Sequence, residues 1–317
     1  MVGKYDIEIY NNKVHYFLEV NRNITILKGN SATGKTELIR LVSEYEANGA
    51  SSGISLKCEK KCSVLTNVAW ELRLSALSQT IVFIDETADF IKTKRFAELV
   101  RGSDNYFVIV TRDDLSQLPY SVDEIYGLVN VSSTSKYKAY KKVYNEMYRL
   151  YNLNPIQNVN PELVITEDSN SGYQCFSHIF DKCISSNGKS NIYESIREHK
   201  DKKLLVIVDG AAFGPEIGKI MGYLSLNECK CVIYAPESFE YIILKSELLD
   251  VPNEIINQTY NYADSKEFAS WEEYYNKYLI NLSQQTIYKY SKTQLNKNYL
   301  GKKALEKIKH VLPEQIQ

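Results

Sequence analysis

One eight-residue segment constrains the fold of this chain more than any other feature. Residues 29–36 follow the pattern G-x-x-x-x-G-K-S/T, which ends here in Lys35 and Thr36. The two glycines allow successive backbone N–H groups to turn inward around a phosphate, and a helix that follows such a loop adds its positive N-terminus. We therefore predict that this segment is an anion cradle between a strand and a helix.

The flanking residues fit that prediction. Residues 23–27 form a short run that is typical of a strand, and residues 37–45 carry Leu38, Leu41 and Val42 at helical spacing. The sequence therefore predicts a strand, a glycine loop and a helix in that order.

Each part of the cradle has a predicted role. Lys35 is expected to reach the β and γ phosphates of a nucleotide, where its charge is catalytic, and the hydroxyl of Thr36 is an expected ligand of Mg²⁺. The residues predicted to contact the nucleotide are Gly29, Asn30, Ser31, Ala32, Thr33, Gly34, Lys35 and Thr36.

A pair of acids follows the next predicted buried strand. Residues 80–84 form a nearly continuous apolar run, and Asp85 and Glu86 come directly after it. Asp85 is expected to orient Mg²⁺, while Glu86 is suited to polarise the water that attacks the γ phosphate, as a catalytic residue. The alternative is that Glu86 only caps a helix that begins near Thr87.

A further buried strand, predicted at residues 106–110, ends in Thr111 and Arg112. Thr111 is expected to touch the γ phosphate or the attacking water, and Arg112 to stabilise charge in the transition state, within its own subunit or in a neighbouring one. An arginine at a strand end is more often a surface residue, so this alternative stays open.

The nucleotide is predicted to be ATP, because no NKxD-like segment for guanine follows a suitable strand; Asn12-Lys13 precedes the loop and continues as Val14-His15. On these motifs the N-terminal half resembles P-loop ATPases of the AAA and ABC-like kind, and its entering hairpin at residues 5–20 is closer to the latter. It differs from transporter ATPases in lacking an LSGGQ-type segment. The head-to-tail dimer that this segment serves in transporter ATPases is therefore not predicted for this chain.

Length and charge set further limits. The 317 residues favour two domains, and 38 Lys+Arg against 39 Asp+Glu argue against a protein that coats nucleic acid non-specifically. No apolar run approaches the roughly 20 residues of a membrane span, and residues 1–10 lack the pattern of a signal peptide. We therefore expect a cytoplasmic protein without a membrane partner.

Strands that alternate with helices in both halves predict an α/β protein with mostly parallel sheets. Two prolines and a loss of periodicity at residues 151–161 indicate a domain boundary. The predicted organisation is a P-loop NTPase domain at residues 1–152, a second α/β domain at 160–264, and a helical, lysine-rich C-terminal tail at 265–317.

Acids also end two predicted strands of the second domain. Glu167 and Asp168 follow the strand at residues 163–166, and Asp209 follows the strand at 204–208. The carboxyl edge of an open parallel sheet is where ligands gather, and carboxylates are suited to bind Mg²⁺. Glu167 and Asp209 are therefore the predicted metal ligands of this domain.

The order of these elements resembles a Toprim domain. A helix predicted at 172–183, a turn at 186–189 and a helix at 191–199 separate Glu167 from Asp209. In that family a Glu and a later DxD bind Mg²⁺ for cutting or rejoining nucleic acid. ATPases of the overcoming-lysogenization-defect type carry such a domain after a P-loop module, and the resemblance covers most of this chain.

The chain departs from the family pattern where the second acid of DxD belongs, because Asp209 is followed by Gly210 and Ala211. Later acids that are candidates to complete the site are Glu216, Glu237 and Glu240. The alternative is that all these carboxylates only cap helices and end strands.

The tail combines cations with aromatic residues. Its lysines are Lys289, Lys292, Lys297, Lys302, Lys303, Lys307 and Lys309, and its interleaved tyrosines are Tyr288, Tyr290 and Tyr299. Lysines beside stacking aromatics predict contact with nucleic acid, whereas the alternative is an ordinary solvated helix face.

These features predict an ATP-binding and ATP-hydrolysing protein whose Toprim-like domain binds or cuts nucleic acid, with Mg²⁺, under nucleotide control. One alternative is an ATP-driven switch whose second domain is a non-catalytic module that binds a protein partner. Another is a nucleotide bound for structure without turnover. The sequence leaves the oligomeric state and the identity of the partner open.

Overall fold

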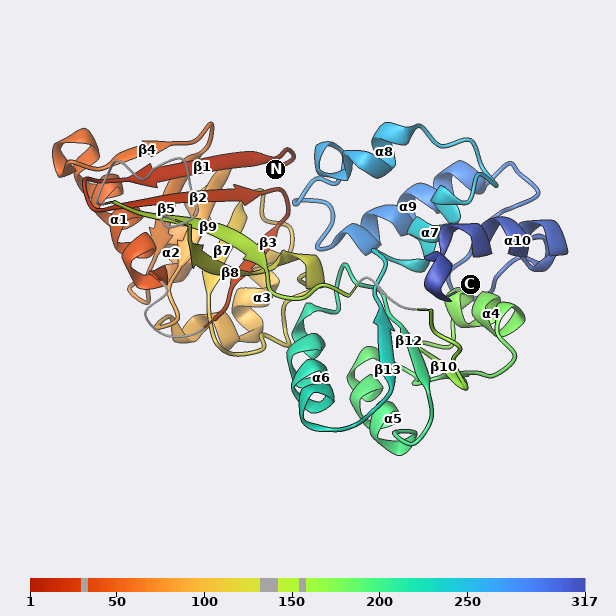
Figure 1. Ribbon diagram of the computed structural model, residues 1–317. Helices are drawn as coiled ribbons and strands as arrows, with labels where there is room; N and C mark the ends of the chain where they lie inside the picture. Colours follow the sequence, from red (N-terminus) through yellow and green to blue (C-terminus); the bar gives the residue numbers. More distant parts are fainter. Residues whose placement is uncertain (30–33, 132–141, 154–157, 317) are drawn as a thin grey trace. The chain divides into compact units, whose positions relative to one another are not determined.

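The chain forms two compact units in the computed structural model, which describes residues 1–29, 34–131, 142–153 and 158–316. Unit 1 comprises Met1–Tyr151 and Tyr260–Ala269, and unit 2 comprises Asn152–Thr259 and Ser270–Gln317. Each unit is built around its own β-sheet (Figure 1). Within the described residues, no helix has the length and apolar content that crossing a membrane requires.

Unit 1 contains a nine-stranded sheet in the order β4-β1-β2-β9-β8-β3-β7-β6-β5. Its strands are β1 (Tyr5–Tyr10), β2 (Val14–Val20), β3 (Ile24–Leu27), β4 (Ser55–Lys57), β5 (Lys61–Leu65), β6 (Thr80–Ile84), β7 (Tyr106–Val110), β8 (Ile125–Asn130) and β9 (Val143–Arg149). β8, β3, β7, β6 and β5 form a parallel series, whereas β1 pairs antiparallel with β2 and β4, and β8 with β9. The expected α/β architecture with a mostly parallel sheet is confirmed.

The central strands are buried along their whole length. Every residue of β3, β6 and β7 is buried, as expected for parallel strands covered on both faces. This burial explains why these segments read as nearly continuous apolar runs.

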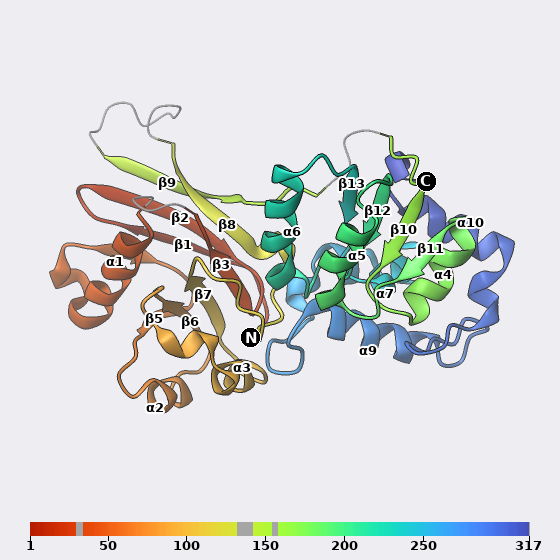
Figure 2. The same ribbon diagram turned by 90° about the horizontal axis from the view of Figure 1, so that it is seen from below.

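Helix α1 (Lys35–Asn48) packs inside the curve of this sheet. It buries Leu38, Leu41 and Val42, and it contacts strands from both ends of the sheet order, including β1 and β5 (Figure 2). The edge strands β4 and β5 are joined by only three residues, 58–60. Because four Cα steps span at most about 14 Å, the end of β4 and the start of β5 lie close together.

The other helical elements of unit 1 are short. They are α2 (Trp70–Ser75), α3 (Lys94–Val100) and the 3-10 turns η1 (Gly49–Ser52), η2 (Asp89–Lys92) and η3 (Val122–Glu124); η5 (Thr259–Asn261) lies where the chain returns from unit 2.

Unit 2 is built on a four-stranded parallel sheet in the order β11-β10-β12-β13. Its strands are β10 (Leu163–Thr166), β11 (Cys183–Ser185), β12 (Leu204–Ile207) and β13 (Cys231–Tyr234). Its helices are α4 (Ser171–Ile179), α5 (Ile192–Glu198), α6 (Gly214–Leu226), α7 (Phe239–Lys245), α8 (Asn253–Asn257), α9 (Trp271–Ser283) and α10 (Lys302–Val311), with 3-10 turns η4 (Lys189–Asn191), η6 (Lys297–Leu300) and η7 (Glu314–Ile316). α5 packs beside α6, while α7 packs against α9 and α10 (Figure 1).

One predicted helix is wrong at its C-terminal end. The helix expected at residues 172–183 ends at Ile179 as α4, and residues 183–185 instead form β11 beside β10. Pairing with β10 satisfies the backbone groups of this three-residue strand, which is too short to show a sequence period of its own.

The expected separate tail at residues 265–317 is instead divided between the units. Residues 260–269 belong to unit 1, where the ammonium of Met1 lies 2.8 Å from the Asp264 carboxylate and the Asn23 amide donates to the Phe268 carbonyl at 2.7 Å. Residues 270–317 belong to unit 2, where buried Tyr275 and Leu279 anchor α9. Long-range burial therefore decides the place of this segment.

Gly210, which lies just after β12, packs closely against the backbone of residues 235 and 236. A Cβ at this position would lie 2.5 Å from the Ala235 carbonyl oxygen and 2.8 Å from that of Pro236. Because backbone cannot move aside as a flexible side chain can, we expect Gly210→Ala to destabilise unit 2 by about 3 kcal/mol.

The free energy of unfolding of unit 2 is measured by urea unfolding followed by the fluorescence of Trp271. A Trp70→Phe background removes the other tryptophan, which lies in unit 1. Gly222→Ala is the matched control, because Gly222 is a helical glycine with nothing within 4 Å of its would-be Cβ. We expect that control to be neutral or stabilising by about 1 kcal/mol. Equal effects of the two changes would contradict the close packing at Gly210.

Candidate functional site

The carboxyl ends of three adjacent strands form the first candidate site, in unit 1. β7 lies between β3 and β6 and is parallel to both. The residues that follow these strands therefore share one edge of the sheet. They are Gly29 after β3, Thr111 and Arg112 after β7, and Asp85 and Glu86 after β6.

The glycine loop begins and ends in the left-handed region of backbone conformation. Gly29 has φ of 124° and Gly34 has φ of 87°, which residues other than glycine adopt only with strain. The intervening loop residues for which nucleotide contact is predicted, Asn30, Ser31, Ala32 and Thr33, lie outside the described residues.

Lys35 is the first residue of α1 and is buried. Its ammonium donates a hydrogen bond of 3.0 Å to the carbonyl of Gly29, so the side chain folds back over the start of the loop. Burial lowers the pKa of Lys35, the nearby charge of Glu86 raises it, and that of Arg112 lowers it again. The three predicted catalytic side chains thus lie close enough for their charges to interact.

Tyr16 of β2 braces the end of the loop. Its hydroxyl donates a hydrogen bond of 2.8 Å to the carbonyl of Gly34, and a Cβ on Gly34 would lie only 2.6 Å from that hydroxyl. Burial raises the pKa of Tyr16 to about 12, so the hydroxyl remains a donor at neutral pH. No sequence pattern indicates this contact, because a tyrosine in a hairpin strand is common.

The acids after β6 are held in a turn. The Asp85 carboxylate accepts the N–H of Glu86 at 2.9 Å, and the next helical element, η2, begins only at Asp89. No helix begins at Thr87, so the capping alternative for Glu86 does not describe this turn. The guanidinium of Arg112 donates to the Glu86 carboxylate from Nε at 3.1 Å and from Nη2 at 3.4 Å.

Thr36 and Asp85 line one pocket of about 470 Å³, together with residues of β5 and α1. This places the two predicted ligands of Mg²⁺ at the same cavity. Thr111 differs, because it is buried and its hydroxyl accepts the N–H of Asp113 at 3.0 Å. For Thr111 to contact a phosphate as predicted, its hydroxyl would have to give up the hydrogen bond from the N–H of Asp113.

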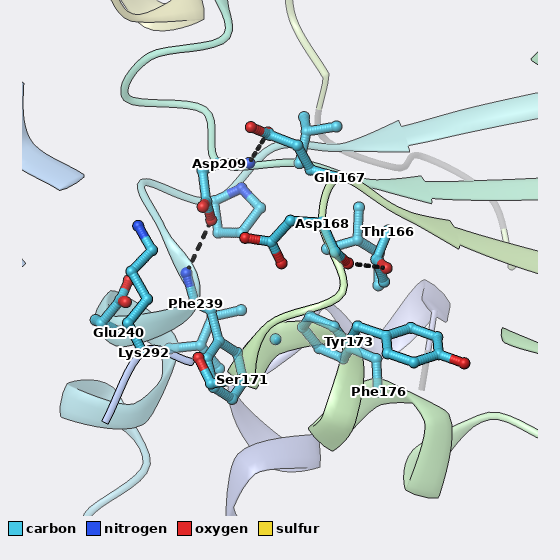
Figure 3. Close-up of a pocket in the computed structure, with 15 residues that line it drawn as sticks. Thr166, Glu167, Asp168, Ser171, Tyr173, Phe176, Asp209, Phe239, Glu240 and Lys292 are labelled. Carbon is cyan, nitrogen blue, oxygen red and sulfur yellow. Dashed lines mark hydrogen bonds between the residues drawn. The ribbon is translucent and has the colours of Figure 1, made fainter. Parts of the chain in front are cut away.

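The second candidate site lies at the carboxyl edge of the unit 2 sheet. Glu167 comes directly after β10, and Asp209 comes two residues after the end of the neighbouring parallel strand β12. Both residues line one small pocket of about 30 Å³ (Figure 3). The Glu167 carboxylate accepts the N–H of Asp209 at 3.1 Å. The Asp209 carboxylate accepts the N–H of Phe239 at 3.0 Å.

Burial dominates the electrostatics of these two acids. It raises the pKa of Glu167 to about 7, against the opposing hydrogen bond from the Asp209 backbone. It also raises the pKa of Asp209 well above its usual range, and the negative charges of Glu272, Glu167 and Glu240 add to this effect. Both groups therefore hold their protons to unusually high pH.

The three acids that were candidates to complete the site differ in their burial and in whether they line the pocket. Glu240 is 1% exposed and lines the pocket, where the Tyr290 hydroxyl donates to it at 2.7 Å. Glu216 and Glu237 are half-buried and do not line it. Ala211, at the place of the second acid of DxD, is buried.

Part of the C-terminal segment contributes to this site instead of facing solvent. Lys292 lines the pocket, and its ammonium lies 2.5 Å from the Glu272 carboxylate. Tyr290 and Tyr299 are buried, which removes two of the three tyrosines expected to stack on bases. The lysines of the segment that remain exposed are Lys289, Lys297, Lys302, Lys303, Lys307 and Lys309.

A metal ion has little support from the donors at this edge. Within the described part of the chain, no three His, Cys, Asp or Glu side chains are grouped so that they could hold one. The carboxylates of Glu167 and Asp209 are each engaged by a backbone N–H, and an ammonium is already present.

The chain was also compared with family models, curated proteins and solved structures, and none of them matches it.

The raised pKa of Glu167 predicts how unit 2 responds to pH. Between its ordinary value of 4.5 and about 7, the folded state keeps the proton that the unfolded state has lost. Stability should therefore fall as the pH rises through this interval. Glu167→Gln should flatten part of that fall, because a neutral amide oxygen can still accept the N–H of Asp209. The residual slope belongs to Asp209 and Glu240, whose pKa values burial also raises.

The measurement is urea unfolding between pH 4.5 and 8, followed by Trp271 fluorescence in the Trp70→Phe background. Glu228→Gln, at an exposed acid of unit 2, is the matched control and should leave the slope unchanged. If stability falls with pH equally steeply in the wild type and in Glu167→Gln, the raised pKa of Glu167 is contradicted.

Proposed function

We propose that this chain binds ATP at the carboxyl edge of the unit 1 sheet and hydrolyses it. The observation that carries the proposal is that β7 lies between β3 and β6, so that Lys35, Glu86 and Arg112 converge beside a glycine loop. A cation over the loop, an acid suited to polarise water and a second cation are the groups that phosphoryl transfer to water requires.

Lys35 binds and orients the phosphates, since its buried ammonium already lies over the start of the loop. Mg²⁺, when bound with the nucleotide, neutralises phosphate charge, and Thr36 and Asp85 are the residues that would hold it. The absence of an NKxD-like segment favours ATP over GTP.

The pair between Arg112 and Glu86 adds a condition for turnover. The guanidinium of Arg112 forms two hydrogen bonds with the Glu86 carboxylate, so a water molecule has to compete with Arg112 for the same oxygens. Arg112 must therefore move towards the phosphates before Glu86 can polarise a water molecule. Binding of the nucleotide supplies the negative charge that draws the guanidinium away.

Phosphate release from ATP tests this proposal. Lys35→Ala should abolish both ATP-dependent thermal stabilisation and turnover, because it removes the charge that holds the phosphates. Glu86→Gln should retain binding and lose turnover by about 100-fold or more, because an amide cannot take a proton from water.

Matched controls are Lys94→Ala and Glu98→Gln, which lie exposed on α3 and should behave as wild type. Turnover that survives Lys35→Ala would contradict the assigned site. Stabilisation by ATP without any turnover in the wild type would leave a nucleotide-loaded switch in place of an ATPase.

For unit 2 we propose an effector whose access to a partner depends on the nucleotide state of unit 1. Two functions compete: Mg²⁺-dependent cutting of nucleic acid, as the Toprim resemblance implies, and binding of a nucleic-acid or protein partner without cutting. The engaged carboxylates of Glu167 and Asp209 and the buried Ala211 favour binding without cutting.

Incubation with supercoiled plasmid in Mg²⁺ or Mn²⁺ distinguishes these functions. We expect no cleavage by the wild type, with or without ATP, and unchanged results for Glu167→Ala and Asp209→Ala. Metal-dependent cleavage that is lost in both variants would instead establish the cutting function.

A further inference from the structure

Two cysteines lie at the link between β4 and β5. Cys58 is the first residue after β4, and Cys62 is the second residue of β5. The N–H of Lys60 donates a hydrogen bond to the Cys58 sulfur at 3.4 Å, and the Cys62 sulfur lies 3.9 Å from the Lys60 carbonyl oxygen. Both sulfur atoms therefore contact the backbone of the same residue of the link.

The two thiols also contact each other at the margin of a hydrophobic core. The S–H group of Cys62 donates a hydrogen bond to the sulfur of Cys58. Cys62 is 8% exposed and belongs to the core cluster that encloses α1, whereas Cys58 is half-buried and packs against the same cluster. Cys58 is thus the member of the pair that a small solute meets first.

The hydrogen bond between the thiols makes their acidities differ. It is the largest influence on the pKa of Cys58 and lowers it, and the N–H of Lys60 lowers it further, although burial and the charges of Glu59 and Asp6 oppose this effect. The same hydrogen bond, together with burial, raises the pKa of Cys62. Burial also raises the pKa of the other four cysteines, which are Cys175, Cys183, Cys229 and Cys231. Cys58 is therefore the cysteine of this chain that ionises most readily, and the thiolate is the form that reacts with oxidants.

We propose that Cys58 and Cys62 are a redox-active dithiol, which a peroxide converts into an intramolecular disulfide across the link between β4 and β5. The Cys58 sulfur attacks one oxygen of hydrogen peroxide, the O–O bond breaks, and a sulfenic acid and one water molecule form. The Cys62 sulfur then attacks the Cys58 sulfur, the S–O bond breaks, and the hydroxide leaves with the Cys62 proton as a second water molecule. The two thiols are oxidised, and the peroxide is reduced to water.

The position of Cys58 outside both strands permits this step. A disulfide brings its sulfur atoms to about 2.05 Å, so the two side chains have to approach each other. Cys58 takes part in neither the pairing of β4 with β1 nor that of β5 with β6, and its movement breaks no ladder hydrogen bond. The product is a covalent ring over residues 58–62 that ties the end of β4 to the start of β5. The inference concerns unit 1 alone and does not depend on ATP hydrolysis.

The test is oxidation of the folded full chain by hydrogen peroxide at neutral pH without nucleotide, followed by tryptic peptide mapping. Wild type should lose two of its six free thiols. Because trypsin cuts after Lys60 and Lys61, the disulfide should appear as two linked peptides that contain Cys58 and Cys62. Dithiothreitol should restore both thiols.

Two alanine variants assign the role of each sulfur. Cys62→Ala should stop at a sulfenic acid on Cys58, which dimedone traps, because the second sulfur is missing. Cys58→Ala should leave Cys62 reduced at the same exposure to peroxide, because Cys62 is buried and holds its proton.

Brief alkylation of the folded protein with iodoacetamide measures the reactivity of Cys58 independently of peroxide. Cys58 should react about tenfold faster than Cys229, which is also half-buried but has a raised pKa. Cys62→Ala should slow this reaction, because Cys58 loses the hydrogen bond that favours its thiolate. Cys229→Ser is the matched control and should leave both the alkylation of Cys58 and the disulfide unchanged.

Three outcomes would overturn the proposal. The first is a folded wild type that keeps both thiols at a peroxide dose that fully oxidises a small-molecule thiol. The second is a disulfide that forms only after unfolding in urea, and the third is a sulfenic acid that persists on Cys58 in the wild type. The mapping of the wild type needs no substitution, so it decides the question even if an alanine variant fails to fold. Because ATP is absent throughout, each of these failures leaves the proposed ATPase function untouched.

Discussion

The satisfaction of backbone hydrogen bonds in buried parallel strands is the constraint on which the candidate sites depend. β3, β7 and β6 have no access to solvent, so each must find its partners on both sides within the sheet. Parallel pairing then brings the ends of all three strands to one edge. Residues 29, 86 and 112 are thereby gathered although they are distant in the sequence, and no side chain has to specify that proximity.

The same constraint has an electrostatic cost in unit 2. Adjacent parallel strands deliver Glu167 and Asp209 into one desolvated pocket, where α7 adds Glu240. Buried like charges raise one another's pKa, and a fold that keeps them needs protons or a cation. Lys292 supplies the cation, and because it arrives from a segment about 80 residues beyond Asp209, the compensation ties the last part of the chain to the sheet.

Local patterns sufficed to predict much of this arrangement. The apolar runs predicted β3, β6 and β7, the positions directly after β6 marked Asp85 and Glu86 as candidate site residues, and the glycine pattern at residues 29–36 marked Lys35. Contacts across long separations were beyond the reach of such patterns. Tyr16 contacts Gly34 from another strand, and Tyr290 contacts Ser171 across 119 residues.

Side-chain direction was the other limit. Glu237 lies just before α7 and Glu240 lies in its first turn, and only the packing of that helix turns Glu240 inward. Lys292 has the same sequence signature as the exposed lysines around it, since composition does not reveal which member of a charged run lines a pocket. For the same reason the return of residues 260–269 to unit 1 follows from contacts such as that of the Met1 ammonium, which have no sequence signature.

The three-residue link between β4 and β5 has a consequence for how unit 1 meets other molecules. An open nine-stranded sheet would offer two unpaired edges, each a template for strand addition by another chain. Here the outermost strands are held within about 14 Å of each other at residues 57 and 61. A strand from another chain could therefore not extend either edge past residues 57 and 61 without meeting the link itself, so residues 58–60 restrict strand addition at this end of both edges.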